Sequence, residues 1–75
     1  MSRDEDYSKF KELAEKRVNR AIKDIRLIGN LSNRGNYSYT DQDAKKIYAA
    51  LKKALEEMKS RFDSKGASED ESFKL

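Results

Sequence analysis

Two segments of the chain carry apolar side chains at helical spacing. The first, over about residues 6–28, has a stripe of seven residues three or four apart: Tyr7, Phe10, Ala14, Val18, Ala21, Ile25 and Ile28. This spacing is typical of the packed face of an α-helix. Leu13 and Ile22 flank the stripe and widen it to about half the helix circumference. An apolar arc of that width predicts contact with more than one neighbouring helix.

The second segment, over about residues 41–62, has a narrower apolar stripe. Its members are again three or four residues apart: Ala44, Ile47, Leu51, Leu55, Met58 and Phe62. Thr40 is a favourable N-cap, and Asp43 three residues later completes a near capping box, with Asp where Glu is usual. The sequence therefore predicts a second helix that begins directly after Thr40.

The connection, residues 29–40, is longer than the ~2–8 residues that antiparallel helices usually need. Gly29 is expected to end the first helix in the left-handed conformation, which glycine adopts without a Cβ penalty. The surplus length marks this loop as the place for a function.

These patterns predict an all-α fold: a two-helix antiparallel hairpin over residues 1–62, followed by a flexible acidic tail over 63–75 that is rich in Ser, Gly and acids. Two helices seldom make an adequate core in a domain this small. Dimerisation into a homodimeric four-helix bundle is the economical solution, and burial of the same surface on a different protein is the alternative. The predicted core and dimer residues are Phe10, Val18, Ile22, Ile25, Ile28, Ile47, Leu51, Leu55, Met58 and Phe62.

Composition narrows the chemistry. Seventy-five residues make one domain at most, and the chain contains neither cysteine nor histidine, so the commonest metal ligands and the commonest general base are missing. No phosphate loop, nucleophile elbow or metal-ligand spacing is present. We expect no catalytic residues, no metal and no cofactor, and therefore no enzyme. With no apolar run of ~20 residues and no signal peptide, a cytoplasmic protein that does not bind membranes is expected.

The loop offers amide groups, a guanidinium and aromatic faces: Asn30, Asn33, Arg34, Asn36, Tyr37 and Tyr39. This set suits recognition of a peptide backbone, a phosphate or a nucleobase. Turn geometry and covering of the hairpin end are the competing explanation for the same residues. Lys16, Arg20, Lys23 and Arg26 form a basic face opposite the apolar arc of the first helix, which could lie along a nucleic-acid backbone or an acidic partner; an ordinary solvated face is the simpler explanation. The net charge is +3.

The block Ile25-Arg26-Leu27-Ile28-Gly29-Asn30-Leu31-Ser32-Asn33-Arg34, followed by Tyr37-Ser38-Tyr39-Thr40, resembles a small uncharacterised bacterial family of helical-hairpin proteins. Its members share a GNLSNR-like loop, a Tyr-x-Tyr-Thr motif and a second helix that ends near Arg-Phe. The resemblance implies a two-helix core and draws attention to the loop, but it supplies no substrate. By analogy with the small proteins that phages and plasmids carry, it favours a regulator or inhibitor.

The sequence leaves three functions open. The leading one is a non-enzymatic interaction module that binds a protein partner through the loop and the adjoining basic face. In the second, tyrosines stack on the bases of RNA or single-stranded DNA while arginines and lysines meet phosphates. The third is a purely structural dimerisation element without a separate ligand.

Overall fold

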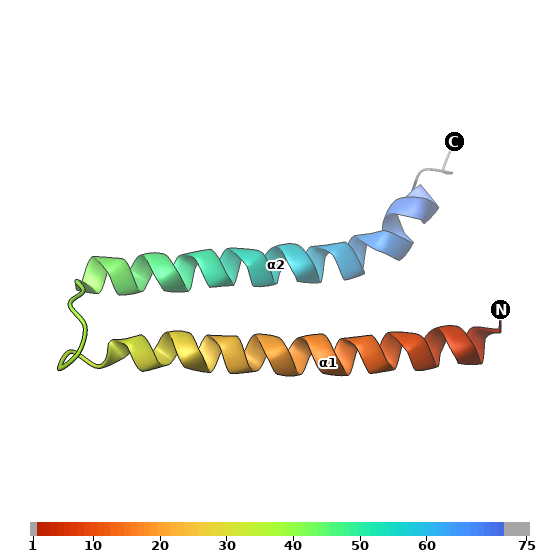
Figure 1. Cartoon of the computed structure of the whole chain (residues 1–75). Coiled ribbons are helices and arrows are strands. Elements are labelled where there is room, and N and C mark those ends of the chain that lie inside the picture. Colours follow the sequence, from red (N-terminus) through yellow and green to blue (C-terminus); the bar gives the residue numbers. More distant parts are fainter. Residues whose placement is uncertain (1, 72–75) are drawn as a thin grey trace. The chain divides into compact units, whose positions relative to one another are not determined.

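The computed structural model describes residues 2–71, and their side chains as far as residue 64. In the described residues all regular structure is helical, in the order α1 (Arg3–Gly29), the short 3-10 helix η1 (Asn30–Ser32) and α2 (Asp41–Glu71). Figure 1 shows α1 in red to yellow and α2 in green to blue. The chain forms two units, Met1–Ser38 and Tyr39–Leu75, and each is described here by itself. The predicted all-α, two-helix architecture is confirmed.

α1 begins three residues earlier than the sequence pattern predicted. The Ser2 hydroxyl accepts a hydrogen bond from the Glu5 backbone N–H at 3.2 Å, and the Glu5 carboxylate accepts one from the Ser2 N–H at 3.1 Å. This reciprocal capping box satisfies two N–H groups that a helix start otherwise leaves unpaired. The acidic side chains of the first turn also suit the positive end of the helix dipole. The apolar stripe starts only at Tyr7, so periodicity alone placed the beginning too late.

The end of α1 corrects the expectation for Gly29. Gly29 has φ −59° and ψ −30°, which is ordinary right-handed helix, and no glycine in the described residues has a positive φ. Asn30 follows at φ −65° and ψ −19°, and its backbone N–H still donates to the Arg26 carbonyl. The chain therefore tightens from α1 into η1, as helix ends often do, and no left-handed residue closes the helix.

The predicted start of α2 is confirmed. The Thr40 hydroxyl accepts from the Asp43 N–H at 3.0 Å, and the Asp43 carboxylate accepts from the Thr40 N–H at 3.0 Å. Aspartate thus completes the capping box that usually carries glutamate, because its shorter side chain still reaches the N-cap nitrogen.

α2 continues to Glu71, so the prediction that it ends near Phe62 is wrong, and residues 63–71 are helical where a flexible tail was expected. No proline interrupts this stretch, and a single internal glycine costs only about 1 kcal/mol against alanine. The Lys59 ammonium also bonds the Asp63 carboxylate one turn further on at 2.9 Å, across the expected boundary. Residues 72–75 of the predicted tail lie outside the described residues.

None of the side chains that the structure describes is buried. Nine of the ten predicted core and dimer residues are exposed, by 36% to 64% of their surface, and the tenth, Ile28, is half-buried. Helices in proteins derive most of their stability from packing an apolar face against other elements, and isolated helices are marginally stable in water. Each unit therefore has an amphipathic helix whose apolar face is still open to water.

Candidate interaction surface

Asn33 organises the loop that follows α1. Its side-chain Oδ1 accepts a hydrogen bond from the Gly35 N–H at 2.9 Å. Its backbone carbonyl accepts from the N–H groups of Asn36 at 3.1 Å and Tyr37 at 3.0 Å. This is the local bonding that favours asparagine in turns. The Asn33 oxygen is thereby engaged within the loop, as the turn explanation of the sequence requires.

Gly35 lies close to the Asn33 side chain at the same turn. A Cβ at this position would lie 3.1 Å from the Asn33 Oδ1, the atom that accepts the Gly35 N–H, so a larger residue would make that side chain shift by a few tenths of an ångström. The backbone at Gly35 has no positive φ, so this close approach is the local constraint on the position. By contrast, a Cβ at Gly29 would have no neighbour within 4 Å.

The turn presents the side chains between Asn33 and Ser38 at the surface. Tyr37 exposes 50% of its area, while Arg34 and Asn36 are exposed as well. Asn30 is the C-cap of α1 and opens η1, and its carbonyl accepts from the Asn33 N–H at 3.5 Å. A short stretch of the first unit therefore offers one guanidinium, one aromatic ring and one carboxamide on a backbone held by internal hydrogen bonds.

Tyr39 belongs to the second unit, directly before the cap of α2, and it is half-buried. The neighbouring cap lowers the pKa of the Asp43 carboxyl below its ordinary value of 3.8. The larger cause is the hydrogen bond from the Thr40 backbone N–H, and the smaller one is a hydrogen bond with the Thr40 side chain. Both act by hydrogen bonding to the ionised form. The start of α2 thus carries a carboxylate that stays charged to lower pH than an isolated aspartate.

The basic face lies on α1. Lys16, Arg20, Lys23 and Arg26 follow one another by three or four residues and are all exposed. At 100° per residue they fall within about 120° of the helix circumference, on the side away from the stripe through Val18 and Ile25. The two faces of α1 are therefore chemically distinct: one is cationic and the other is apolar.

The apolar face of α1 begins with an aromatic pair. The rings of Tyr7 and Phe10 have centroids 6.5 Å apart and planes inclined by 28°. Both rings remain more than half exposed, and Val18 and Ile25 continue the exposed face along the helix. The first unit, taken by itself, therefore presents a continuous exposed apolar face along α1.

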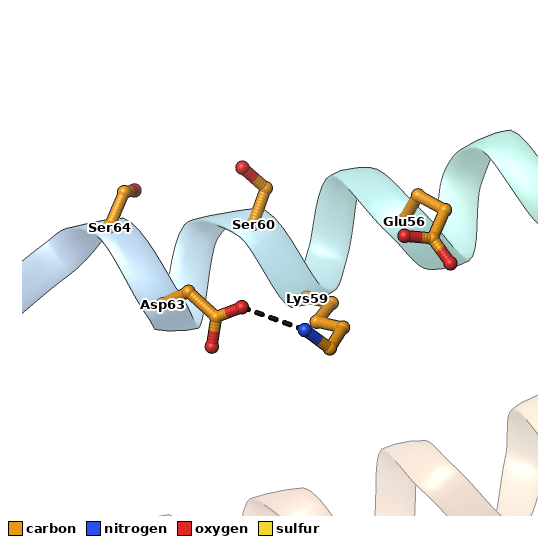
Figure 2. A pocket seen from close by; sticks show the side chains of 5 residues that line it. All are labelled: Glu56, Lys59, Ser60, Asp63 and Ser64. Carbon is orange, nitrogen blue, oxygen red and sulfur yellow. Dashed lines mark hydrogen bonds and ion pairs between the residues drawn. The ribbon is translucent and has the colours of Figure 1, made fainter.

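A shallow hollow lies on the surface of α2. Figure 2 shows its lining, which is Glu56, Lys59, Ser60, Asp63 and Ser64, with the Lys59–Asp63 ion pair across it. All five residues come from three successive turns of one helix, and the paired side chains are 69% and 65% exposed. The hollow is therefore open to water along its length.

In the described residues, no group of three or more potential metal-ligating side chains gathers, and no helix there has a stretch long and apolar enough to cross a bilayer. Compared with family models, curated proteins and solved structures, the chain matches none of them.

Proposed function

We propose that this chain is a small non-enzymatic interaction protein that associates with itself through its apolar faces and binds a protein partner through the loop. The observation that carries the proposal is the exposure of fifteen large apolar side chains in the described residues, most of them in rows along the two helices. Exposed apolar faces that follow a helix in this way are stabilised when another helix covers them.

In the proposed assembly the two helices of each chain pair as an antiparallel hairpin, and two hairpins form a homodimeric four-helix bundle. The supporting feature is the similar spacing of the stripes through Phe10 and Ile25 on α1 and through Ile47 and Leu55 on α2. Their three-and-four rhythm suits knobs-into-holes packing between helices. The width of the α1 stripe, which Leu13 and Ile22 extend, provides surface for more than one neighbour.

The partner-binding surface consists of Arg34, Asn36 and Tyr37, with the basic face of α1 beside it along the chain. An exposed tyrosine supplies contact area at low entropic cost, and arginine supplies a charged anchor; both residue types are enriched at binding hot spots. The hydrogen bonds of Asn33 hold the backbone beneath them, which lowers the ordering cost of binding. A protein partner with an acidic rim fits this combination.

The basic face also supports nucleic-acid binding as a second candidate. Four exposed cations on one side of α1, with Tyr37 available to stack on a base, are the components of a single-strand binding surface. The two functions respond differently to salt, since neutralising several phosphates makes affinity fall steeply between about 50 and 200 mM.

The experiment compares Tyr37→Ala with Tyr48→Ala, an equally drastic change at an exposed tyrosine of α2 (68% exposed). A protein that copurifies with the wild type and with Tyr48→Ala, but is lost from Tyr37→Ala at unchanged melting temperature, supports the proposal. Retention of the partner by both variants contradicts it. Anisotropy titration with labelled RNA and duplex DNA at two salt concentrations tests the second candidate, which fails if neither binds at ~50 mM.

A further inference from the structure

Apart from Val18, whose counterpart is Arg17, the apolar stripe of α1 has the same pattern in both directions. The stripe has its midpoint between Arg17 and Val18. Tyr7, Phe10 and Ala14 lie as far before this midpoint as Ile28, Ile25 and Ala21 lie after it, and the flanking Leu13 lies as far before it as Ile22 lies after it. When two copies of such a helix pack antiparallel, large residues meet large ones near both ends. Alanines meet alanines on either side of the centre, where they allow the backbones to approach closely.

A parallel pair in register would also match the stripe with itself, so the apolar pattern alone does not distinguish parallel from antiparallel packing. The net charges of the two halves of α1 favour one direction. Residues 3–15 carry three basic and five acidic side chains, a net charge of −2, whereas residues 16–29 carry five basic and one acidic, a net charge of +4. A parallel pair places like charge beside like charge along its whole length. An antiparallel pair brings each acidic half level with a basic half. Lys16, Arg20, Lys23 and Arg26 lie on the side away from the stripe, so the attraction acts between the net charges of the two halves and not through ion pairs of these residues.

The helix dipoles favour the same direction, because the positive N-terminus of one helix then lies near the negative C-terminus of the other. We propose that a second copy of this chain covers the apolar face of α1, with the two α1 helices antiparallel about a two-fold axis beside Arg17 and Val18. This inference rests on the proposed homodimer and adds its geometry. Such a contact is isologous: each residue pair between the two copies, such as Ala14 with Ala21, occurs twice.

The chain has no native cysteine, so disulfide trapping reports the direction directly. Ala14→Cys and Ala21→Cys copies are prepared separately, mixed, equilibrated and oxidised. In the proposed geometry, positions 14 and 21 of different copies face each other, and the cross-link joins a Cys-14 copy to a Cys-21 copy. Either variant oxidised alone stays uncross-linked, because its two thiols lie about 10 Å apart along the axis, beyond the ~7 Å Cα separation that a disulfide tolerates.

In a parallel pair, each variant cross-links with itself, and that result overturns the inference. Absence of any cross-link in a chain that circular dichroism shows to be helical overturns it as well. Native mass spectrometry separates the possible failures. A wild-type monomer of 8.7 kDa contradicts both the proposed homodimer and this geometry. A dimer with self-cross-linking cysteines contradicts only the geometry.

Spin labels at Ser8→Cys and Asn19→Cys give a second measurement that leaves the apolar stripe intact. Both residues are exposed, and their separation of eleven residues puts them on nearly the same side of α1. In the antiparallel dimer, the two labels at position 8 lie ~28 Å apart along the axis and those at position 19 only ~5 Å. The measured distance should therefore be markedly longer for Ser8→Cys. Equal distances at the two sites overturn the inference.

Discussion

Replacing Gly29 by alanine should stabilise the protein. Gly29 is the last residue of α1, its backbone is right-handed helical (φ −59°, ψ −30°), and a Cβ would have no neighbour within 4 Å. Alanine therefore fits without strain and restricts the unfolded chain. The full glycine-to-alanine difference inside a helix is about 1 kcal/mol. Since Gly29 lies at the end of α1, we expect a gain of ~0.5–1 kcal/mol in the free energy of unfolding.

Urea or thermal unfolding followed by circular dichroism at 222 nm measures this effect. A gain of that size corresponds to a rise in melting temperature of several degrees for a domain this small, at about 4–8 °C per kcal/mol. Protein concentration must be held fixed, because self-association makes the melting temperature concentration-dependent. The matched control is Gly35→Ala, whose Cβ would crowd the Asn33 Oδ1 at 3.1 Å and which should not stabilise the chain. Loss of ~1 kcal/mol in Gly29→Ala, the cost expected if Gly29 needed a positive φ, would refute the reasoning.

The two helix caps and the carboxylate at the second one give further predictions. Thr40→Ala removes the hydroxyl that accepts a hydrogen bond from the Asp43 N–H and should lower the free energy of unfolding by about 1 kcal/mol. Ser2→Ala should have the same effect through α1. An unchanged unfolding midpoint in either variant would contradict the stabilising role of that cap. The pKa of Asp43, measured by NMR titration of its side-chain carbonyl carbon, should fall below the ordinary 3.8 because the Thr40 N–H and hydroxyl interactions favour the ionised form. Since the folded pKa is lowered, Asp43 stabilises α2 above its unfolded pKa, and this contribution disappears as the pH falls through the folded value; a measured pKa at or above 3.8 would exclude it.

Much of the fold follows from the sequence, and the differences have local causes. The three-and-four spacing identified both helices, and Thr40-x-x-Asp43 located the start of α2 because its cap bonds involve only neighbours in sequence. Ser2-x-x-Glu5 is the same motif at the start of α1, but it precedes the apolar stripe, so apolar spacing alone does not place the helix start there. The end of α2 was placed too early because loss of apolar periodicity after Phe62 does not end a helix when side chains such as Lys59 and Asp63 still pair across one turn.

The candidate site was predictable only in part. Sequence composition identified the loop as unusual, yet it could not separate residues that build the turn from residues that face solvent. The structure makes that separation: the Asn33 oxygen bonds Gly35, whereas Tyr37 exposes half of its ring. The conformation of Gly29 was not predictable either. Glycine occurs at both right-handed and left-handed helix ends, and only the backbone angles distinguish the two.

Sedimentation equilibrium tests most directly whether the apolar face of α1 is covered by a second copy. We predict about twice the chain mass of 8.7 kDa for the wild type, and loss of that dimer in Ile25→Asp, which would bury an unpaired charge on the stripe. Leu27→Asp is the matched control, because Leu27 is equally exposed (53% against 50%) but lies off the stripe on the helix wheel, and it should remain dimeric. A monomeric wild type, or equal disruption by the two substitutions, would contradict the account.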